Sequence, residues 1–143
     1  EIFFKEAAKK NIAIIARVPL ASGLLTGKMS KESIFPKNDH RNYNINGDAF
    51  DVGETFSGVN FEKGLDAAEK LKNILPAGFS LADMALKWIL MHEEVTVVIP
   101  GAKNNDQVKK NVLASEKNDI SEIISDINTV YENLIEPYVK DRW

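Results

Sequence analysis

A glycine-containing turn with polar side chains follows the apolar segment Val95–Ile99 and offers chemistry suited to an anionic ligand. Gly101 frees the backbone to turn, and Lys103 places an ammonium group at the mouth of the turn. Gln107 and Asn111 are four residues apart, so a helix that starts after the turn would carry both on one face. The N-terminus of such a helix presents N–H groups and a positive dipole end, which favour a phosphate. The segment is therefore a candidate seat for a ligand with a phosphate and a polar part.

The same residues also allow a plainer interpretation. Asn104, Asn105 and Asp106 are all preferred N-cap residues. Many joints between a strand, a turn and a helix bind nothing, and a well-capped turn with solvated lysines would have the same sequence. The residues of this turn alone leave both interpretations open.

A second candidate turn follows the apolar run Ile12–Ala16. Gly23 and Gly27 bracket a tight loop at the carboxyl end of this run, where α/β proteins place their ligands. Hydroxyl and ammonium donors stand within the loop at Ser22, Thr26 and Lys28. The two turns together indicate one anionic ligand that is held from two strand ends.

The second turn does not fit a phosphate-binding loop of the Walker type. That motif has four residues between its first glycine and Gly-Lys, and then a Ser or Thr. Gly23 is followed by only three residues before Gly27 and Lys28, and Met29 comes next. The spacing argues against this class of nucleotide site.

Two apolar runs have the composition of strands and must position both turns. Ile12–Ala16 and Val95–Ile99 are rich in β-branched residues, which predicts short strands that are buried on both faces. Pro19 and Pro100 end the strands, because proline cannot donate to a central ladder. Strands that alternate with helices form right-handed βαβ units on a parallel sheet. Two strands leave two apolar edges open, so we expect something outside this chain to complete the sheet.

Helical periodicity is present on both sides of the strands. Residues 1–10, 62–75 and 80–92 carry apolar side chains at helical spacing. Residues 80–92 are apolar on most sides, so they predict the most buried helix, with Trp88 in the core.

Two further helices are expected in the last third of the chain. The helix after Gly101 is expected to turn three apolar residues inward, which are Val108, Val112 and Leu113. Ser121 is expected to cap a last amphipathic helix that runs to about Leu134. A tail from Tyr138 to Trp143 would follow.

Residues 20–60 differ in kind from the rest of the chain. Glycine, asparagine, aspartate and serine are interspersed throughout this segment, which indicates a loop. So long a loop in a compact chain is usually functional or disordered. Phe50 and Phe56 favour a loop that is partly docked onto the rest of the protein.

Composition limits the class of protein. The chain has 143 residues with 44% apolar content, enough for one domain or one piece of a larger one. A net charge of −3 without a basic stripe argues against a nucleic-acid partner or an anionic membrane. The absence of cysteine excludes disulfides and thiolate metal sites, and two distant histidines make a histidine metal site unexpected. No apolar run has membrane-spanning length and no secretory signal is visible, so a cytoplasmic protein is expected. The start at Glu1, inside a helical pattern and without an initiator methionine, suggests a piece of a longer protein.

The two turns in order resemble the last two strand–loop units of an aldo-keto reductase. The segments that carry the resemblance are A-R-V-P-L-A-S-G-L-L-T-G-K, V-V-I-P-G-A-K-N-N-D-Q-V-K-K-N and the helix S-L-A-D-M-A-L-K-W-I-L. The resemblance covers nearly the whole chain. It implies an α/β fold, the C-terminal part of a (β/α)8 TIM barrel, with two parallel strands and about five helices. Residues 1–143 would then be one C-terminal fragment of the barrel.

The resemblance also implies a site for a nicotinamide cofactor, NADP or alternatively NAD. Arg17 stands where the family sets a planar side chain against the nicotinamide ring, and a guanidinium can stack in this way. The pyrophosphate would be gripped by six residues, which are Pro19, Leu20, Ser22, Gly23, Leu24 and Lys28. Val18 departs from the serine usual in the family, which removes one expected hydrogen bond to phosphate.

The adenosine end of the cofactor falls on the other turn. Gly101 and Lys103 correspond to the positions around the 2′-phosphate. Gln107 and Asn111 correspond to the positions that contact ribose and adenine. Lys110 replaces a common glutamate, which could change the adenine edge of the site or add charge near the phosphate.

The catalytic residues of the family have no counterpart here. Its tyrosine, lysine, histidine and aspartate come from the first half of the barrel, and the tyrosines of this chain lack the surrounding pattern. The resemblance therefore implies the cofactor-binding part of an enzyme that passes hydride from NADPH to a small aldehyde or ketone. The chain alone is expected to be inactive and to bind cofactor weakly or not at all.

A rival hypothesis from another class is a non-catalytic module derived from the same barrel, with a cofactor-sensing or regulatory role. The length of the native reading frame would distinguish the two. An upstream segment that completes a barrel supports the enzyme, and a start at Glu1 supports the module. In either case the open strand edges are expected to make the isolated chain self-associate or repack.

Overall fold

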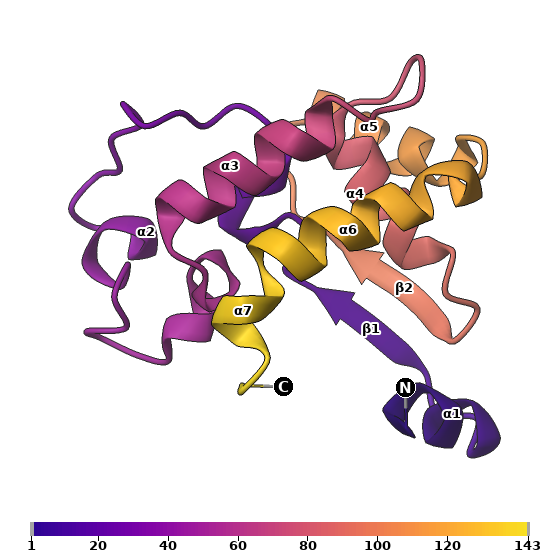
Figure 1. Cartoon of the computed structure of the whole chain (residues 1–143). Coiled ribbons are helices and arrows are strands. Elements are labelled where there is room, and N and C mark those ends of the chain that lie inside the picture. The colour runs from indigo at the N-terminus through magenta and orange to yellow at the C-terminus, as the bar shows by residue number, and fades with distance from the viewer. Residues whose placement is uncertain (1, 143) are drawn as a thin grey trace. The chain divides into compact units, whose positions relative to one another are not determined.

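Helices and two parallel strands alternate along the chain (Figure 1). The computed structural model describes residues 2–142. The longer elements are α1 (Ile2–Lys9), β1 (Ile14–Arg17), α3 (Phe61–Lys72), α4 (Leu81–Leu90), β2 (Val95–Ile99), α5 (Asn105–Glu116) and α6 (Ile124–Leu134). Two four-residue helices are α2 (His40–Tyr43) and α7 (Glu136–Val139). Glu1 of the expected first helix and Trp143 of the expected tail lie outside the described residues.

The chain divides into two compact units, and each is discontinuous in sequence. One unit consists of Glu1–Pro19 and Asp83–Ile120, and the other of Leu20–Ala82 and Ser121–Trp143. The first unit holds both strands with α1, α5 and most of α4. The second unit holds α2, α3, α6 and α7.

The sheet of the first unit consists of β1 and β2 in parallel, as expected (Figure 1). The register pairs Ile14 with Val95, Ile15 with Val97, Ala16 with Val98 and Arg17 with Ile99. Thr96 is an extra residue in β2, and the register is irregular at this point. Its hydroxyl oxygen accepts a hydrogen bond from the Ile14 N–H at 3.1 Å, so a side chain replaces a ladder bond that the irregularity removes.

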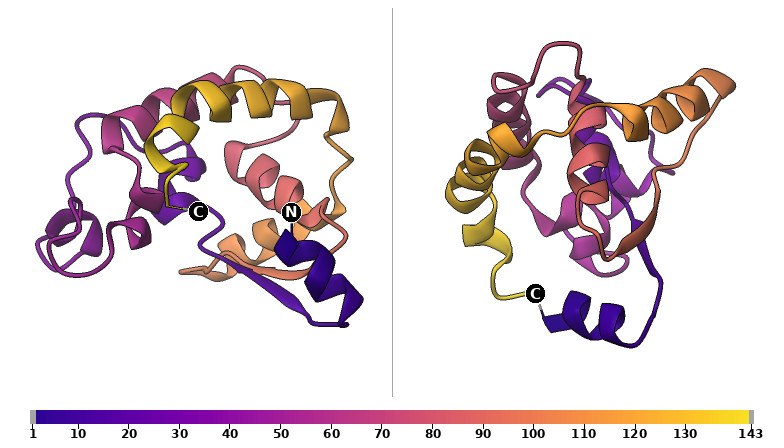
Figure 2. Two further views of the ribbon diagram at one scale, coloured as in Figure 1. Left: turned by 60° about the horizontal axis from the view of Figure 1, so that its bottom comes forward. Right: turned by 90° about the vertical axis from the view of Figure 1, so that its right-hand side faces the viewer.

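The expectation that both strands are buried on both faces is wrong for this chain. Ile14 is buried, whereas Ile15 is 60% exposed and Ile99 is 54% exposed. The paired residues Ile15 and Val97 share the exposed face, as do Arg17 and Ile99. Figure 2 shows α4 against one face of the two strands. An apolar run indicates what a strand can bury, but the neighbouring elements decide how much of it is covered.

Helix α4 is the most buried helix of the first unit, as expected, but Trp88 is not in its core. Leu86 and Met84 are 2% and 3% exposed, whereas Trp88 is 37% exposed. The Trp88 ring meets His92 edge-on with ring centroids 4.8 Å apart. A tryptophan can keep one edge in solvent while its body covers neighbours, so an apolar helical position does not guarantee a core position.

The inward-facing residues expected on α5 are also exposed. Val108, Val112 and Leu113 are 51%, 57% and 54% exposed, and Ala114 is the buried residue of this helix. The helix begins with Asn104 as its N-cap, whose side chain accepts a hydrogen bond from the Gln107 N–H at 2.9 Å. Of the three candidate caps, Asn104 therefore takes the role.

In the second unit, α3 and α6 pack side by side (Figure 1). Asn60 caps α3, and its side chain accepts hydrogen bonds from the N–H groups of Glu62 and Lys63. A 3-10 turn at Ser121–Ile123 precedes α6, whose N-cap is Ile123 without a side-chain hydrogen bond. The expected cap at Ser121 therefore lies one turn before the helix begins.

The segment 20–60 is irregular, as expected, but it contains short helical turns and is well packed at several points. Besides α2, it forms 3-10 helices η1 (Ala21–Thr26), η2 (Val52–Glu54) and η3 (Phe56–Gly58). Phe56 is 1% exposed, which confirms the expected docking of this residue. Its ring lies 4.9 Å from that of Phe61 and 5.9 Å from that of Phe35, measured between centroids. Phe50 remains 42% exposed.

None of the helices formed by residues 2–142 has the length and apolar character needed to cross a membrane.

Candidate cofactor site

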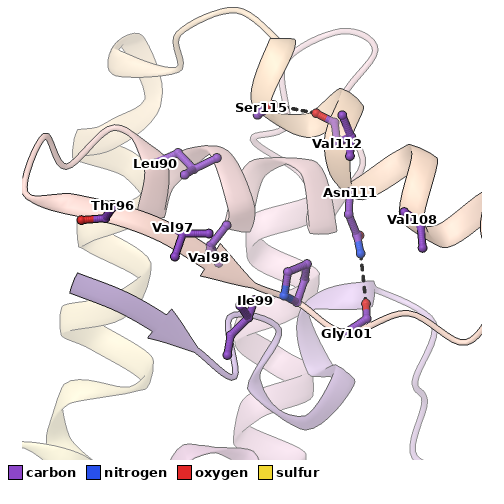
Figure 3. A pocket seen from close by; sticks show the side chains of 11 residues that line it. Leu90, Thr96, Val97, Val98, Ile99, Gly101, Val108, Asn111, Val112 and Ser115 are labelled. Carbon is purple, nitrogen blue, oxygen red and sulfur yellow. Dashed lines mark hydrogen bonds between the residues drawn. The ribbon is translucent and has the colours of Figure 1, made fainter. Parts of the chain in front are cut away.

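The turn after β2 is held against α5 by side-chain amides. Gly101 adopts φ +70° and so turns the chain out of the strand. The Asn111 Nδ2 group donates a hydrogen bond to the carbonyl oxygen of Gly101 at 3.0 Å (Figure 3). The Lys103 N–H donates to the Oε1 atom of Gln107. Two of the four expected site residues, Gly101 and Lys103, lie in the turn, and the other two, Gln107 and Asn111, lie on α5. Each residue of the turn is hydrogen-bonded to one of the two residues on the helix.

Each of these amides keeps a polar atom for a ligand. An amide side chain has one oxygen and an NH2 group with two donors. Gln107 uses its oxygen in the turn, and Asn111 uses its NH2 group. Within residues 2–142, Gln107 Nε2 and Asn111 Oδ1 find no partner. One donor group and one acceptor on α5 are therefore available to a ligand.

An open groove of about 500 Å3 adjoins this turn between β2 and α5 (Figure 3). Its walls are apolar, and they include Val97, Ile99, Val108 and Val112. The apolar side of α5 does face β2, but the groove between them is open. This openness explains why Val108 and Val112 are exposed although they were expected to turn inward.

The end of β1 places Arg17 beside the sheet's exposed face. Arg17 pairs with Ile99 in the register and is exposed. Val18 follows with φ +52°, a conformation that a β-branched residue rarely adopts. Pro19 is buried. The chain therefore leaves β1 through a strained residue, at the position where the sequence departs from the serine of the family pattern.

The second turn, in the other unit, is built from left-handed backbone. Ala21, Ser22 and Gly23 have φ values of +45°, +54° and +101°. The φ value of Gly23 favours glycine at this position, whereas the space that a Cβ atom would need is limited only by the terminal methyl group of the flexible Met29 side chain, 2.7 Å away. Leu24 is buried at 5% exposure and anchors the turn in the core of its unit.

The hydroxyl groups expected to face a ligand are occupied within the loop. Ser22 Oγ accepts a hydrogen bond from the Phe56 N–H at 3.1 Å and donates to the Glu54 carbonyl oxygen at 3.5 Å. Thr26 Oγ1 donates to the Gly23 carbonyl oxygen at 2.7 Å. These two side chains therefore shape the turn, and Lys28 is left as its exposed cation.

Two residues that sequence reasoning missed support this second turn. Arg41 forms a bidentate ion pair with Asp39, with N–O distances of 2.9 and 2.6 Å, and its guanidinium lies 4.7 Å from the centre of the Phe35 ring. Arg41 also donates to the Ser22 carbonyl oxygen at 3.4 Å. The hydrogen bond from Arg41 lowers the pKa of Asp39 to about 2. The sequence does contain a signal for this ion pair. It is an aspartate and an arginine two residues apart, close in sequence to the aromatic Phe35.

The site residues thus fall into two groups. Arg17, Pro19 and the four residues around Gly101 belong to the first unit, and Leu20, Ser22, Gly23, Leu24 and Lys28 belong to the second. Each group forms a defined turn within its own unit. No cluster of three His, Cys, Asp or Glu side chains that could hold a metal ion occurs among residues 2–142.

The model of the aldo/keto reductase family matches residues 1–132. An aldo-keto reductase of Schizosaccharomyces pombe, whose name specifies NADP(+), is 27% identical over 108 residues, covering 75% of this chain and 29% of that protein. An L-glyceraldehyde 3-phosphate reductase of Escherichia coli O157:H7 is 35% identical over 104 residues, covering 72% of this chain and 28% of that protein.

A solved structure supports the same assignment. The glycerol dehydrogenase of Gluconobacter oxydans matches with a TM-score of 0.73 and 26% identity, over 92% of this chain and 38% of that one. The chain spans about a third of the length of the curated relatives that it matches. Its fold is that of the C-terminal part of a (β/α)8 barrel, with two parallel strands. The chain belongs to the aldo/keto reductase family.

Proposed function

We propose that this chain is the cofactor-binding, C-terminal portion of an NADP-dependent aldo-keto reductase, with residues 1–143 forming one piece of the barrel. The observation that carries the proposal is the turn after β2, where Gln107 and Asn111 each use one end of the amide to fix the turn and keep the other end without a partner among residues 2–142. A merely capped turn does not need two further amides to hold it.

The residues present fit the adenosine end of such a cofactor. The start of α5 offers N–H groups and a positive dipole end to a phosphate. The exposed Lys103 adds an ammonium group, and within residues 2–142 this group has no ion-pair partner. The Nε2 group of Gln107 can donate a hydrogen bond to a sugar or a purine, and the Oδ1 atom of Asn111 can accept one. The Lys103 ammonium could form an ion pair with a 2′-phosphate on the ribose. NADP carries this phosphate and NAD does not, so Lys103 favours NADP.

The pyrophosphate is assigned to the second turn. Because Ser22 and Thr26 use their hydroxyl groups inside the loop, the phosphate oxygens would be held by backbone N–H groups of the turn and by Lys28. Arg17 would lie flat against the nicotinamide ring. The cofactor, when bound, supplies the hydride for reduction of an aldehyde or ketone. The residues of this chain would bind and orient the cofactor, while the proton donor comes from outside the chain.

The names of two relatives support the reaction class. One has a name that specifies NADP(+), and another is named for the reduction of an aldehyde phosphate. The 143-residue chain by itself is expected to have no reductase activity, because the family's catalytic residues have no counterpart in it.

The test uses the protein expressed from its complete native reading frame, titrated with NADPH and with NADH by protein fluorescence. We expect tighter binding of NADPH. Lys103→Ala should weaken NADPH binding about fivefold and leave NADH binding unchanged, since an exposed ammonium–phosphate pair contributes about 1 kcal/mol. Lys109→Ala, at an exposed neighbouring lysine of α5, is the matched control.

The outcomes separate the alternatives. Binding with turnover of a broad aldehyde supports the reductase. Binding of NADPH without turnover of any aldehyde or ketone would support the cofactor-sensing module instead. Failure to bind either nucleotide would contradict both.

A further inference from the structure

A buried asparagine forms the centre of the long loop in the second unit. Asn44 is 0% exposed, and its amide makes every hydrogen bond that it can. Its Oδ1 accepts from the N–H groups of Ala49 and Phe50, both at 2.9 Å. Its Nδ2 donates to Thr55 Oγ1 at 3.1 Å and to the Asp51 carbonyl oxygen at 3.4 Å. Only an amide side chain offers two donors and an acceptor oxygen at this point, so Asn44 fixes the path of residues 44–55.

Thr55 extends this network to the candidate pyrophosphate turn. Thr55 is 1% exposed, and its Oγ1 also shares a hydrogen bond of 3.2 Å with His40 Nδ1. The next residue, Phe56, is 1% exposed and donates its N–H to Ser22 Oγ at 3.1 Å. The loop is therefore joined to the turn by a short chain of bonds through Asn44, Thr55, Phe56 and Ser22.

Both ends of the Ser22–Phe56 hydrogen bond have left-handed backbone. Ala21 and Ser22 have φ values of +45° and +54°, and Phe56 and Ser57 have values of +51° and +57°. Residues with side chains keep such conformations only where the surrounding structure enforces them. Here the surrounding structure is the Asn44 network on one side and the packed Phe56 ring on the other.

We propose that Asn44 and Thr55 are positioning residues that hold the Ser22–Gly23 turn in the shape that receives the pyrophosphate. Neither side chain touches the cofactor in this scheme. They act through Phe56 and Ser22, so that the turn is preorganised before the cofactor arrives. This inference rests on the proposed function for its ligand, but the ordering of the turn can be measured without any ligand.

The first measurement is hydrogen–deuterium exchange on the cofactor-free protein from the complete native reading frame. Asn44→Ala and the nearly isosteric Thr55→Val should speed exchange in the segment Leu20–Leu25, where the N–H groups of Gly23 and Leu25 both donate to the Leu20 carbonyl oxygen. Thr55→Val guards against the case in which Asn44→Ala fails to fold. Thr55→Ser keeps the hydroxyl and should restore slow exchange.

Asn46→Ala is the matched control. Asn46 stands two residues after Asn44 in the same loop, is exposed, and makes no hydrogen bond with any residue in the range 2–142. It should leave exchange in Leu20–Leu25 unchanged. Unchanged exchange in that segment for both Asn44→Ala and Thr55→Val would overturn the inference, whatever the protein binds.

The second measurement compares two ligands at a temperature where all variants are folded. NADPH carries the pyrophosphate, and adenosine 2′-phosphate carries only the adenosine end. If the turn is competent about a tenth of the time in Thr55→Val, its apparent affinity for NADPH falls about tenfold. Its affinity for adenosine 2′-phosphate should stay the same, and Thr55→Ser should restore NADPH binding. A general loss of stability would not separate the two ligands.

The outcomes distinguish the inference from the proposed function. Faster exchange with an unchanged ratio of the two affinities would overturn the inference and leave the proposed function standing. If the unmodified protein bound neither ligand, the proposed function would fail and the positioning role would fail with it. Faster exchange together with a selective loss of NADPH affinity, both restored by Thr55→Ser, would support the inference.

Discussion

The side-chain NH2 group of Asn111 donates a hydrogen bond to the carbonyl oxygen of Gly101 at 3.0 Å, which ties the second turn of α5 to the turn that ends β2. Asn111→Ala removes this tie. We expect affinity for adenosine 2′-phosphate to fall about fivefold, because one hydrogen bond of this kind contributes about 1 kcal/mol. Fluorescence titration of the protein from the complete reading frame measures this affinity. Asn118→Ala, at an exposed asparagine beyond α5, is the control. Equal affinities for the two variants would count against the role of Asn111.

At Gly64, helix α3 approaches the 3-10 segment Ala21–Thr26 closely. A Cβ atom at this position would lie 2.6 Å from Cδ1 of the buried Leu24. Gly64→Ala gains about 1 kcal/mol of helix propensity but overpacks the core by about 1–3 kcal/mol, so we expect a net loss of about 1 kcal/mol. Urea unfolding measures the difference, with Asp66→Ala on the exposed side of α3 as the control. A more stable Gly64→Ala protein would show that Leu24 can move aside freely.

The Asp39–Arg41 ion pair predicts a pH dependence of stability. The pKa of Asp39 is lowered to about 2 by its hydrogen bond with Arg41, so the folded state binds this proton less readily than the unfolded state. The stabilisation is present above the ordinary carboxyl pKa and is lost as the pH falls from about 4 to about 2. After allowance for solvent screening it amounts to about 1 kcal/mol.

Asp39→Asn should remove that part of the pH dependence. Thermal unfolding between pH 2 and pH 6 measures it, where the variant is expected to be less stable than the unmodified protein at pH 6 and similar to it near pH 2. Asp48→Asn, at an exposed aspartate with no ion-pair partner among residues 2–142, should behave like the unmodified protein. Parallel curves for Asp39→Asn and the unmodified protein would disprove the assignment.

The exposed face of the sheet predicts that the 143-residue chain self-associates when produced alone. Ile15 is 60% exposed and Ile99 is 54% exposed on strands whose outer edges are unpaired in the described structure. Such edges and apolar faces promote association. Sedimentation at increasing concentration should show a rising mass, and Ile15→Lys should lower it. Ile34→Lys, at an isolated loop residue that is 92% exposed, should not. A chain that stays monomeric throughout would contradict this prediction.

Local sequence patterns were sufficient to predict the two strands, the main helices and the capped turn, although β1 covers Ile14–Arg17 and not the expected Ile12–Ala16. β2 begins at Val95 and ends at Ile99 as predicted, because β-branched residues favour a strand and the following Pro100 and Gly101 end it. Asn104 caps α5 because its side chain reaches the Gln107 N–H. The amide pair Gln107 and Asn111 could be placed on one helix face by spacing alone, although its bonds to the turn could not.

The degree of burial and the internal bonding of the long loop could not be predicted. An apolar strand indicates that its faces can be buried, whereas the exposure of Ile15 depends on which elements cover it. Asn44 and Thr55 are hydrogen-bonded to each other, but their spacing in the sequence follows neither the helical nor the strand period. Ser22 was predicted as a ligand donor because of its residue type, but its hydroxyl bonds to Phe56, which is distant in sequence. Contacts of this kind are set by tertiary packing, which leaves no local pattern.

The extra residue at Thr96 makes β2 one residue longer than β1, although the two strands begin and end at paired residues. Deleting it would bring the strands into one-to-one pairing and would leave the Ile14 N–H without its acceptor, while Arg17 and Ile99 would stay paired and the Gly101 turn would keep its place beside the end of β1. The irregularity therefore absorbs a difference of one residue in strand length, so evolution or protein engineering could insert or delete a residue there without displacing the turn.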